Sequence, residues 1–300
     1  MTPTLIDTDP GIDDALALLL AWGSPELAVE ALTTVAGNVP IEHASVNAWR
    51  LIALRRPLPV PNFAQGAAAP LRRPLRTAVA YHGDDGLGDA GGWPAAPARP
   101  APADALDVIG ELARHHRGRL IVIAIGPLTN LALALDRDAD ALRGVGRVVV
   151  MGGAVDVPGN TTPDAEFNMH VDPDAAQQVF EAGLSLDLVP LDATRQAVLL
   201  RGELGAALAR RPGRLADRIA AFTAHGFREH DGSGISGLTL HDPLAVGVAI
   251  DPSLVTWDPA RITIGPDGET RRAPGAPNCR VATRVDRARF VTMFLERLCP

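Results

Sequence analysis

Short apolar runs alternate with stretches of helical periodicity along most of the chain. The runs have the length and aliphatic character of buried strands; one begins at residue 5, and others lie at residues 27–36, 59–63, 120–125, 147–151 and 186–191. The intervening stretches, with apolar residues on one helical face, are residues 41–54, 104–115, 128–135 and 172–183. Because strands and helices that alternate in this way build parallel sheets covered on both faces, the pattern predicts an α/β fold with a mostly parallel central sheet.

The remaining chain is predicted to contain further helices, a strand or hairpin in the tail, and two glycine-rich segments. Residues 201–230 show a helical pattern broken at Pro212, residues 244–250 an apolar helix, and the tail a strand or hairpin followed by an amphipathic helix at 286–298. The glycine-rich segments are residues 77–103 and 231–237. Residues 77–103 are too rich in Gly, Pro and Ala for regular structure and predict a mobile loop. This loop is either a flap over a pocket or a surface loop that exposes His82.

Composition removes several classes of function. The net charge of −7 argues against a nucleic-acid or membrane-surface protein. No apolar stretch reaches the roughly 18 residues of a membrane span, and the N-terminus lacks a secretory pattern, so we expect a cytoplasmic protein. The two cysteines, Cys279 and Cys299, are too few for a disulfide framework or a cysteine metal site. All 28 basic residues are arginine, which excludes a Schiff-base lysine and a Walker-type phosphate loop.

Acidic side chains are concentrated where the first strand meets the first helix. Four carboxylates fall within eight residues, namely Asp7, Asp9, Asp13 and Asp14. Such crowding is unfavourable unless a cation neutralises it, and a hard divalent cation binds oxygen ligands of this kind. The alternative is an acidic surface turn in which Asp13 caps the helix. Pro10 and Gly11 favour the cation site because they bend the chain, whereas Leu18 argues against an EF-hand.

Polar residues also follow later apolar runs. In parallel sheets ligands bind beyond the carboxyl ends of the strands, where both Asp9 and Asn38 are predicted to lie. The loop at 159–168 carries Asn160, Glu166 and Asn168, which suit a polyhydroxylated ligand, although a turn-rich surface loop is the alternative. His241 and Asp242 are either an acid paired with a metal ligand or a helix cap with a bystander histidine.

At this point the chain resembles the calcium-dependent nucleoside hydrolases, the inosine-uridine preferring nucleoside N-ribohydrolase family. The resemblance covers nearly the whole chain. Its motifs are DTDPGIDDALAL at the start, VAGN at 35–38, GPLTNLA at 126–132, MGG at 151–153, GN, AEFN and DPDAA between 159 and 176, and HDPLAV from residue 241. The resemblance implies one Rossmann-like domain with the nucleoside hydrolase fold over residues 1–300, with mobile loops at about 77–103 and 225–240 above the active site.

The resemblance also implies roles for individual residues. Asp9 binds calcium and acts as general base towards the attacking water. The further calcium ligands are Asp14, Asp242 and the backbone carbonyl of Ile125, whereas Asp7 supports the turn. The residues implied in substrate binding are Asp13, Asn160, Glu166 and Asn168 at the ribose, Asn38 near its 5′ side, His82 on the base side, and also Phe167 and Phe227. His241 is implied as the general acid for the departing base.

The implied reaction is hydrolysis of the N-glycosidic bond of a ribonucleoside to free base and ribose. An oxocarbenium-like transition state explains why anionic and amide groups surround the sugar. Calcium holds the ribose diol and acidifies its water, so that a carboxylate can remove the proton near neutral pH. A homodimer or homotetramer is expected by resemblance alone.

The base preference and two alternative functions remain to be weighed against the resemblance. The stretch before HDP lacks the tyrosine usual there, which leaves Phe227, Arg228 or His225 to contact the base. The retained His241 favours the inosine-uridine or pyrimidine-type branch over the purine-specific one. The rival enzyme is a haloacid-dehalogenase-like phosphatase with Asp7 as nucleophile and Asp9 as acid/base, which is disfavoured by Gly11 and by the absence of lysine. A non-catalytic calcium or nucleoside binder is the other alternative, and the intact Asp9 counts against it.

Overall fold

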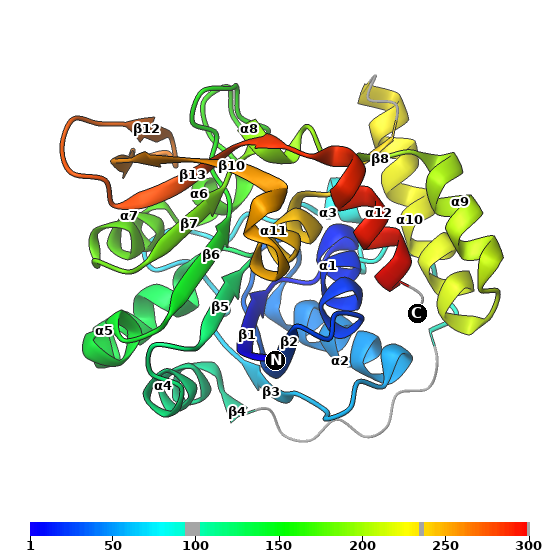
Figure 1. Cartoon of the computed structure of the whole chain (residues 1–300), viewed down its shortest axis with the longest axis horizontal. Helices are drawn as coiled ribbons and strands as arrows, with labels where there is room; N and C mark the ends of the chain where they lie inside the picture. The colour runs from blue at the N-terminus through cyan, green and yellow to red at the C-terminus, as the bar shows by residue number, and fades with distance from the viewer. Residues whose placement is uncertain (94–102, 234–236, 299–300) are drawn as a thin grey trace.

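A large, mostly parallel sheet forms the centre of the molecule in the computed structural model, which describes residues 1–93, 103–233 and 237–298. Within these residues nine strands follow the order β10-β13-β7-β6-β5-β1-β2-β3-β4 (Figure 1). In chain order they are β1 Thr2–Thr8, β2 Leu27–Thr34, β3 Asn62–Gln65, β4 Ala103–Asp104, β5 Ile121–Ala124, β6 Arg147–Met151, β7 Leu186–Val189, β10 Val255–Ala260 and β13 Cys279–Val285. Only the β10–β13 pair is antiparallel, so the predicted sheet is confirmed.

Helices cover both faces of this sheet because parallel strands need crossover connections. One face packs against α1 Ile12–Trp22, α2 Ile41–Arg55, α11 His241–Ile250 and α12 Arg287–Leu298. The other face packs against α4 Ala105–His115, α5 Thr129–Arg143 and α7 Pro173–Glu181 (Figure 1). Strand β1 is buried on both sides, with Leu5 in one hydrophobic cluster and Ile6 in the other. This burial fixes the end of β1, where the acidic turn begins.

The remaining elements lie mainly around the carboxyl edge of the sheet. They are α3 Val79–His82, α6 Phe167–Val171, α8 Leu191–Thr194, β8 Val198–Leu199, α9 Arg201–Arg210, α10 Arg214–Ser233, β9 Leu238–Thr239, the 3₁₀ turn Pro252–Leu254, β11 Ile262–Ile264 and β12 Thr270–Arg272. β8 pairs with β9, and β11 pairs with β12, as two small antiparallel sheets.

One predicted boundary and parts of two predicted loops are wrong. Residues 77–103 contain the short helix α3 and end in β4, which pairs with β3; residues 94–102 lie outside the described part. The strand expected at 186–191 ends at Val189, because helix α8 begins at Leu191. The helical pattern predicted up to residue 230 is confirmed by α10, whereas the loop that the resemblance implied from residue 225 is wrong as far as residue 233, since the apolar side of this helix joins the core; residues 234–236 are not described.

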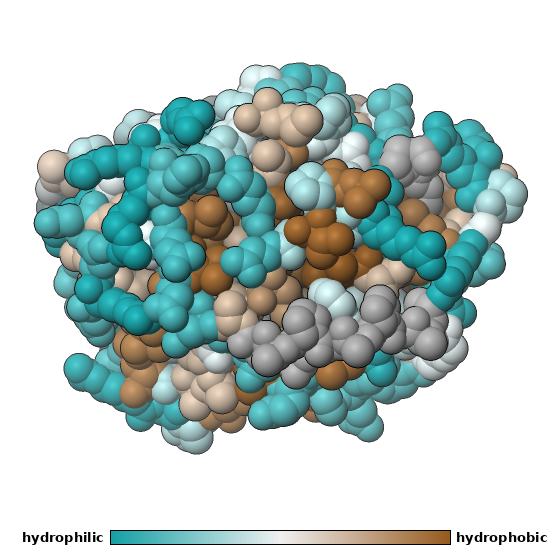
Figure 2. All heavy atoms as spheres, turned by 90° about the horizontal axis from the view of Figure 1, so that it is seen from below, coloured by the Kyte–Doolittle hydropathy of each residue, from teal (hydrophilic) through white to brown (hydrophobic). Residues whose placement is uncertain are grey.

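The outer surface is mixed in character. Figure 2 views the molecule from below, where hydrophilic residues cover most of the face and apolar residues reach the surface in separate patches. Among the described helices, none combines the length and the apolar character needed to cross a membrane.

Candidate active site

The turn after β1 is organised by Asp14. Gly11 occupies the N-cap position of α1, so Asp14 is the third residue of the helix. Its carboxylate accepts hydrogen bonds from the Gly11 N–H at 2.9 Å and the Thr8 hydroxyl at 2.5 Å. It also accepts one from the Asn38 amide at 2.9 Å. Asp13 therefore does not cap the helix, and the surface-turn alternative is wrong because Asp9, Asp13 and Asp14 are buried.

Asp9 lies in a narrow space between two strand ends. Its Oδ2 accepts a hydrogen bond from the Asn38 N–H at 2.6 Å. Two glycines make room for the carboxylate: a Cβ added at Gly37 would collide with Oδ2, and one at Gly126 would lie 2.6 Å from Oδ1. Within the described residues, Oδ1 of Asp9 is buried without a hydrogen-bond partner. A buried carboxylate oxygen normally has a partner, so this atom is open to a cation or a water molecule.

Asp242 completes an acidic cluster from the other end of the chain. It is the second residue of α11, which packs against α1, and its carboxylate lies within 4.8 Å of ligand atoms of Asp13 and Asp14. Asp13 therefore joins the predicted metal ligands as a further candidate. Ile125 offers its carbonyl at the same cavity, where it accepts a hydrogen bond from the Asn168 amide at 3.1 Å.

The electrostatics of this cluster favour a cation. Burial raises the pKa of Asp9 and Asp242 well above their usual range, and the neighbouring carboxylates raise these pKa values further. Burial and the Asp14 charge raise the pKa of Asp13 to about 8. Burial also raises the pKa of Asp14. A divalent cation would remove this repulsion, so the oxygen donors present here fit a metal such as Ca²⁺.

Asp7 is separate from the cluster. Its Oδ1 accepts hydrogen bonds from the Thr33 hydroxyl at 2.5 Å and the Asn130 amide at 2.7 Å, inside the sheet. Burial raises its pKa to about 7. Asp7 does not line the cavity described below, which contradicts the nucleophilic role it has in the phosphatase alternative. Its place fits the predicted support of the turn.

A cavity of about 490 Å³ opens above the cluster at the carboxyl edge of the sheet. Most of the predicted site residues line it, namely Asp13, Asn38, His82, Ile125, Asn160, Glu166, Phe167, Asn168, His241 and Asp242. Asp9 and Asp14 are fully buried and reach the lining through their hydrogen bonds to Asn38. The structure therefore brings together residues from both ends of the chain.

One wall of the cavity is the segment around α6. Glu166 caps this helix by accepting from the Asn168 N–H at 3.0 Å, and it also accepts from the Gly153 N–H at 2.9 Å. The Asn168 amide donates to the carbonyls of Ile125 and Met151. Glu166 and Asn168 are buried, so the surface-loop alternative fails for both, whereas Asn160 is exposed at the rim.

His82 lines the cavity from the short helix α3. It is buried rather than exposed, and its Nδ1 accepts a hydrogen bond from the Ile12 N–H at 3.1 Å. Burial, with a smaller contribution from the nearby His225, lowers the pKa of His82 to about 3. The imidazole is therefore neutral, and Ile12 fixes its proton on Nε2. The alternative of a surface-loop histidine is wrong.

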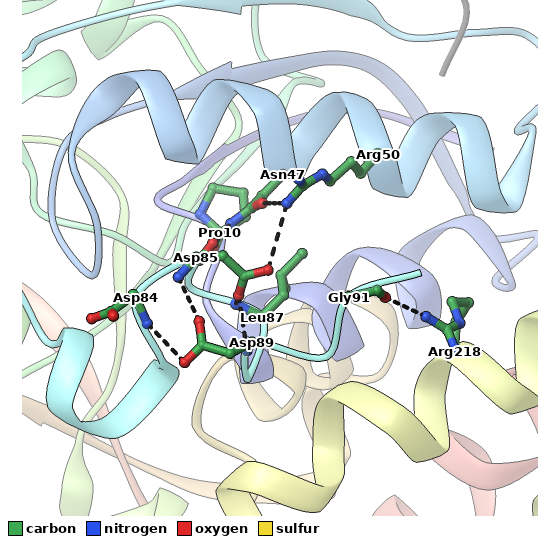
Figure 3. A network of polar contacts seen from close by, with 9 residues as sticks. All are labelled: Pro10, Asn47, Arg50, Asp84, Asp85, Leu87, Asp89, Gly91 and Arg218. Carbon is green, nitrogen blue, oxygen red and sulfur yellow. Dashed lines mark hydrogen bonds and ion pairs between the residues drawn. The ribbon is translucent and has the colours of Figure 1, made fainter. Parts of the chain in front are cut away.

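The chain that follows His82 is held by a polar network (Figure 3). The Asn47 amide donates to the carbonyl of Pro10 at 3.1 Å and to that of Asp85 at 2.7 Å. The Asp89 carboxylate accepts from the Asp85 N–H at 2.9 Å, and Arg218 donates to the Gly91 carbonyl at 2.5 Å. This network ties the described part of residues 77–103 directly to the acidic turn.

His241 begins α11 and faces the cavity beside Asp242. Its Nδ1 lies 2.8 Å from the Thr194 hydroxyl. Phe227, predicted to contact the base, is instead buried in the core below Arg201, whose guanidinium lies 4.6 Å from the ring centroid. That prediction is wrong because Phe227 lies on the apolar side of α10. The other two substitutes, His225 and Arg228, contact each other and do not line the cavity.

Sequence reasoning missed several residues that line the cavity. They are Ala78, Tyr81, Met151, Thr161, Arg195, Glu229 and Thr239. Tyr81 is the single tyrosine of the chain and belongs to α3. An aromatic hydroxyl is thus present at the cavity, but it comes from α3 and not from the stretch before His241. The only available signal was its position next to His82.

Comparison with known proteins agrees with this geometry. A profile of the inosine-uridine preferring nucleoside hydrolase family matches residues 4–292. The non-specific ribonucleoside hydrolase RihC of Klebsiella pneumoniae is 37% identical over 267 residues, covering 89% of this chain and 84% of that protein. The pyrimidine-specific ribonucleoside hydrolase RihA of Salmonella typhimurium is 34% identical over 309 residues, covering 99% and 98%.

Solved structures give the same result. The plant nucleoside hydrolase PpNRh1 matches with a TM-score of 0.92 and 34% identity, covering 99% of both chains. A purine-preferring ribonucleoside hydrolase from Gardnerella vaginalis matches with a TM-score of 0.94 and 30% identity, covering 99% of this chain and 98% of the other. The names of these relatives span non-specific, pyrimidine-specific and purine-preferring enzymes.

Proposed function

The chain belongs to the inosine-uridine preferring nucleoside hydrolase family and hydrolyses ribonucleosides to base and ribose, and we propose that it uses Asp9 as general base, His241 as leaving-group acid and Ca²⁺ as metal. The observation that carries this proposal is the buried, unpartnered Oδ1 of Asp9 beside the cluster of Asp13, Asp14 and Asp242. Among the described residues, the only other buried carboxylate oxygen without a hydrogen-bond partner is Oδ2 of Asp7, and Asp7 does not line the cavity.

The metal would be held by oxygen donors. They are the carboxylates of Asp9, Asp13, Asp14 and Asp242 and the carbonyl of Ile125. Ca²⁺ accepts six to eight such ligands in flexible geometry, which suits donors from two helices and two strand ends. When bound, the cation would supply positive charge that holds the sugar hydroxyls and makes a water easier to deprotonate.

Asp9 is suited to act as the base because its orientation is fixed while one oxygen stays open. The Asn38 N–H holds Oδ2, and Gly37 and Gly126 lack the Cβ that would displace either carboxylate oxygen. Oδ1 then accepts the proton of the water that attacks the anomeric carbon. A cation bound at the cluster would favour the ionised form of this carboxylate and so offset the rise in pKa that burial produces.

The lining of the cavity is suited to a sugar that gains positive charge. Asp13, Glu166 and the amides of Asn160 and Asn168 all line the cavity. Carboxylates stabilise an oxocarbenium-like transition state, and amides bind adjacent hydroxyls in a fixed direction. We assign Asn38 to the 5′ side of the ribose, and Phe167 to its apolar contact.

His82, Tyr81 and His241 form the side on which the base would lie. His241 donates a hydrogen bond or a proton to the base as the glycosidic bond breaks, which lowers the basicity of the leaving group. The neutral His82 offers an N–H donor, since its Nδ1 already accepts from Ile12. These donors fit the carbonyl and ring nitrogen acceptors of purine and pyrimidine bases.

Three broader assignments accompany this proposal. The described residues act as a single domain, in which the described parts of segments 77–103 and 225–240 close the cavity from the base side. The enzyme works in the cytoplasm and assembles as a homodimer or homotetramer. The sequence resemblance supports both the oligomeric assembly and the closing role of the two segments. The closing role is also supported by Tyr81, His82 and Glu229, which belong to these segments and line the cavity.

The test measures ribose release from inosine, uridine, cytidine and adenosine with a reducing-sugar assay, with calcium and after chelation. We expect release that is lost on chelation and restored by Ca²⁺. Asp9→Asn, which keeps the shape of the side chain, should abolish release, whereas Asp140→Asn on the exposed face of α5 should not. Release that survives chelation would refute the metal assignment, and folded, calcium-bound protein that releases no ribose would favour the non-catalytic binder.

A further inference from the structure

Thr194 contacts His241, the proposed leaving-group acid, at its Nδ1 atom. It is the last residue of α8 and is completely buried, and its Oγ1 lies 2.8 Å from His241 Nδ1. We propose that Thr194 is a positioning residue that fixes the tautomer and the ring orientation of His241. This inference rests on the proposed role of His241 in assisting departure of the base.

The backbone around the pair is fixed independently of the two side chains. Four residues after Thr194, strand β8 pairs with β9 in an antiparallel ladder that sets Val198 opposite Thr239. The Leu240 N–H donates to the Ala197 carbonyl at 2.9 Å, directly before α11 begins at His241. The ladder therefore holds the end of α8 and the start of α11 side by side, and the hydroxyl meets the imidazole without adjustment of the backbone.

The available donors and acceptors determine which of Thr194 and His241 donates the hydrogen bond between them. Among the residues that the structure describes, His241 Nδ1 is the only partner of the Thr194 hydroxyl. If Nδ1 carried the proton and donated it, the hydroxyl hydrogen of Thr194 would be buried without an acceptor, which is unfavourable. The hydroxyl therefore donates to Nδ1, and the proton of the neutral imidazole resides on Nε2.

This direction has a consequence for the reaction. Nε2 is on the side of the ring away from Thr194, and His241 lines the cavity on the proposed base side. An N–H on Nε2 can donate to the base as negative charge develops on it, whereas the opposite tautomer would present a lone pair and repel the leaving group. Thr194 thus contributes to the reaction through His241, as the residue that orients the general acid does in other catalytic pairs.

The experiment compares two substrates with the calcium-loaded full-length enzyme. Inosine needs help for its leaving base, whereas 4-nitrophenyl β-D-ribofuranoside releases a nitrophenolate that departs without a proton. Thr194→Val keeps the shape and removes the hydroxyl, and we expect it to lower kcat on inosine by about tenfold, the equivalent of one lost hydrogen bond, with KM and the nitrophenyl reaction unchanged. Thr194→Ser should restore kcat on inosine.

A control and a second readout keep the inference testable if packing changes. Thr4→Val removes an equally buried hydroxyl, which donates to the Thr2 carbonyl at the far end of β1, and should leave both reactions unchanged. A long-range ¹H–¹⁵N spectrum, with the His241 signal assigned among the eight histidines by its loss in His241→Ala, should report the Nε2–H tautomer, and Thr194→Val should weaken that preference.

The outcomes separate this inference from the role of His241 itself. If His241→Ala lowers activity on inosine alone and Thr194→Val has no effect, or the wild-type spectrum reports the Nδ1–H tautomer, Thr194 does not position His241. If Thr194→Val further lowers kcat of His241→Ala, it acts elsewhere and the inference also fails. If His241→Ala slows both substrates equally or neither, the proposed leaving-group role is refuted.

Discussion

Gly126→Ala would displace the proposed base without removing any charged group. Gly126 does not adopt a positive φ, so its backbone tolerates alanine and the effect is steric. The added Cβ would lie 2.6 Å from Asp9 Oδ1, 3.1 Å from Asp9 Cγ and 3.0 Å from a methyl group of Val35. Each of these contacts is too short to persist.

The required displacement follows from these distances. Restoring an ordinary contact of 3.4 Å separates the methyl group and Oδ1 by about 0.8 Å. Rotation of the Asp9 carboxylate away from the methyl group is opposed by the Asn38 N–H, which holds Oδ2 at 2.6 Å. A misplacement of about 1 Å at a reacting group can cost on the order of 100-fold in rate, so we expect kcat to fall by roughly that factor.

The assay is ribose release from inosine and uridine at saturating calcium, with a thermal melt of the same preparation. Gly205→Ala is the matched control, since its Cβ in helix α9 would meet no described heavy atom within 4 Å apart from its chain neighbours and the backbone of its own helix turns. It should leave kcat unchanged and, because alanine favours a helix by about 1 kcal/mol over glycine, should not lower the melting temperature.

A folded Gly126→Ala enzyme with nearly wild-type kcat would refute this reasoning. Such a result would mean either that the carboxylate of Asp9 moves without consequence or that another group removes the proton. Activity that falls only because the protein is unfolded would be recognised from the melt. Gly37→Ala, which approaches Oδ2 even more closely, tests the same carboxylate from its other side.

Four further outcomes are expected. Asp9→Ala should reduce kcat far more than His241→Ala, because it removes both the base and a metal ligand; equal losses in steady-state kinetics would contradict the assignment. In chelated protein, Asp13, with its pKa raised to about 8, is protonated when folded and ionised when unfolded near neutral pH. Its contribution to stability is thus complete below about pH 4 and lost as the pH rises towards 8. The melting temperature should fall between pH 5 and pH 8, and calcium should restore it; a flat profile in chelator would contradict the burial of these charges. Asn47→Ala frees the Pro10 and Asp85 carbonyls and should lower the stability to unfolding by about 1–3 kcal/mol and raise KM, measured by denaturant titration and kinetics. Tyr81→Phe should change the ratio of kcat/KM between uridine and inosine, because Tyr81 lines the base side; an unchanged ratio would exclude its hydroxyl from base selection.

Much of the fold follows from local patterns. Strand β6 matches its predicted range, and α2, α4 and α12 differ from theirs by a residue or so, because burial imposes a period on the sequence that can be counted. The polar ends of the strands predicted the edge on which the cavity lies. Boundaries near proline were less accurate: β3 begins at Asn62 rather than residue 59, after a proline-rich stretch.

The candidate site, like the fold, was predicted in part from the sequence. The sequence indicated Asp9, Asp13 and Asp14 as a local group, and the family motifs indicated the distant Asp242. It did not indicate that Asp13 joins Asp14 and Asp242 in one cluster, since this depends on how α1 packs against α11. Phe227 was misassigned because helical periodicity alone does not say which side of α10 faces the core.

The sequence by itself therefore determined the parallel α/β architecture, the acidic turn and the family, because strand and helix periods, turn residues and motifs are properties of neighbouring residues. Only the tertiary structure decided that Tyr81 reaches the cavity, that Ile12 fixes the tautomer of His82, and that Thr194 meets His241. Each of these contacts joins residues far apart in the chain. Such pairings arise from the packing of whole elements, which no local pattern encodes.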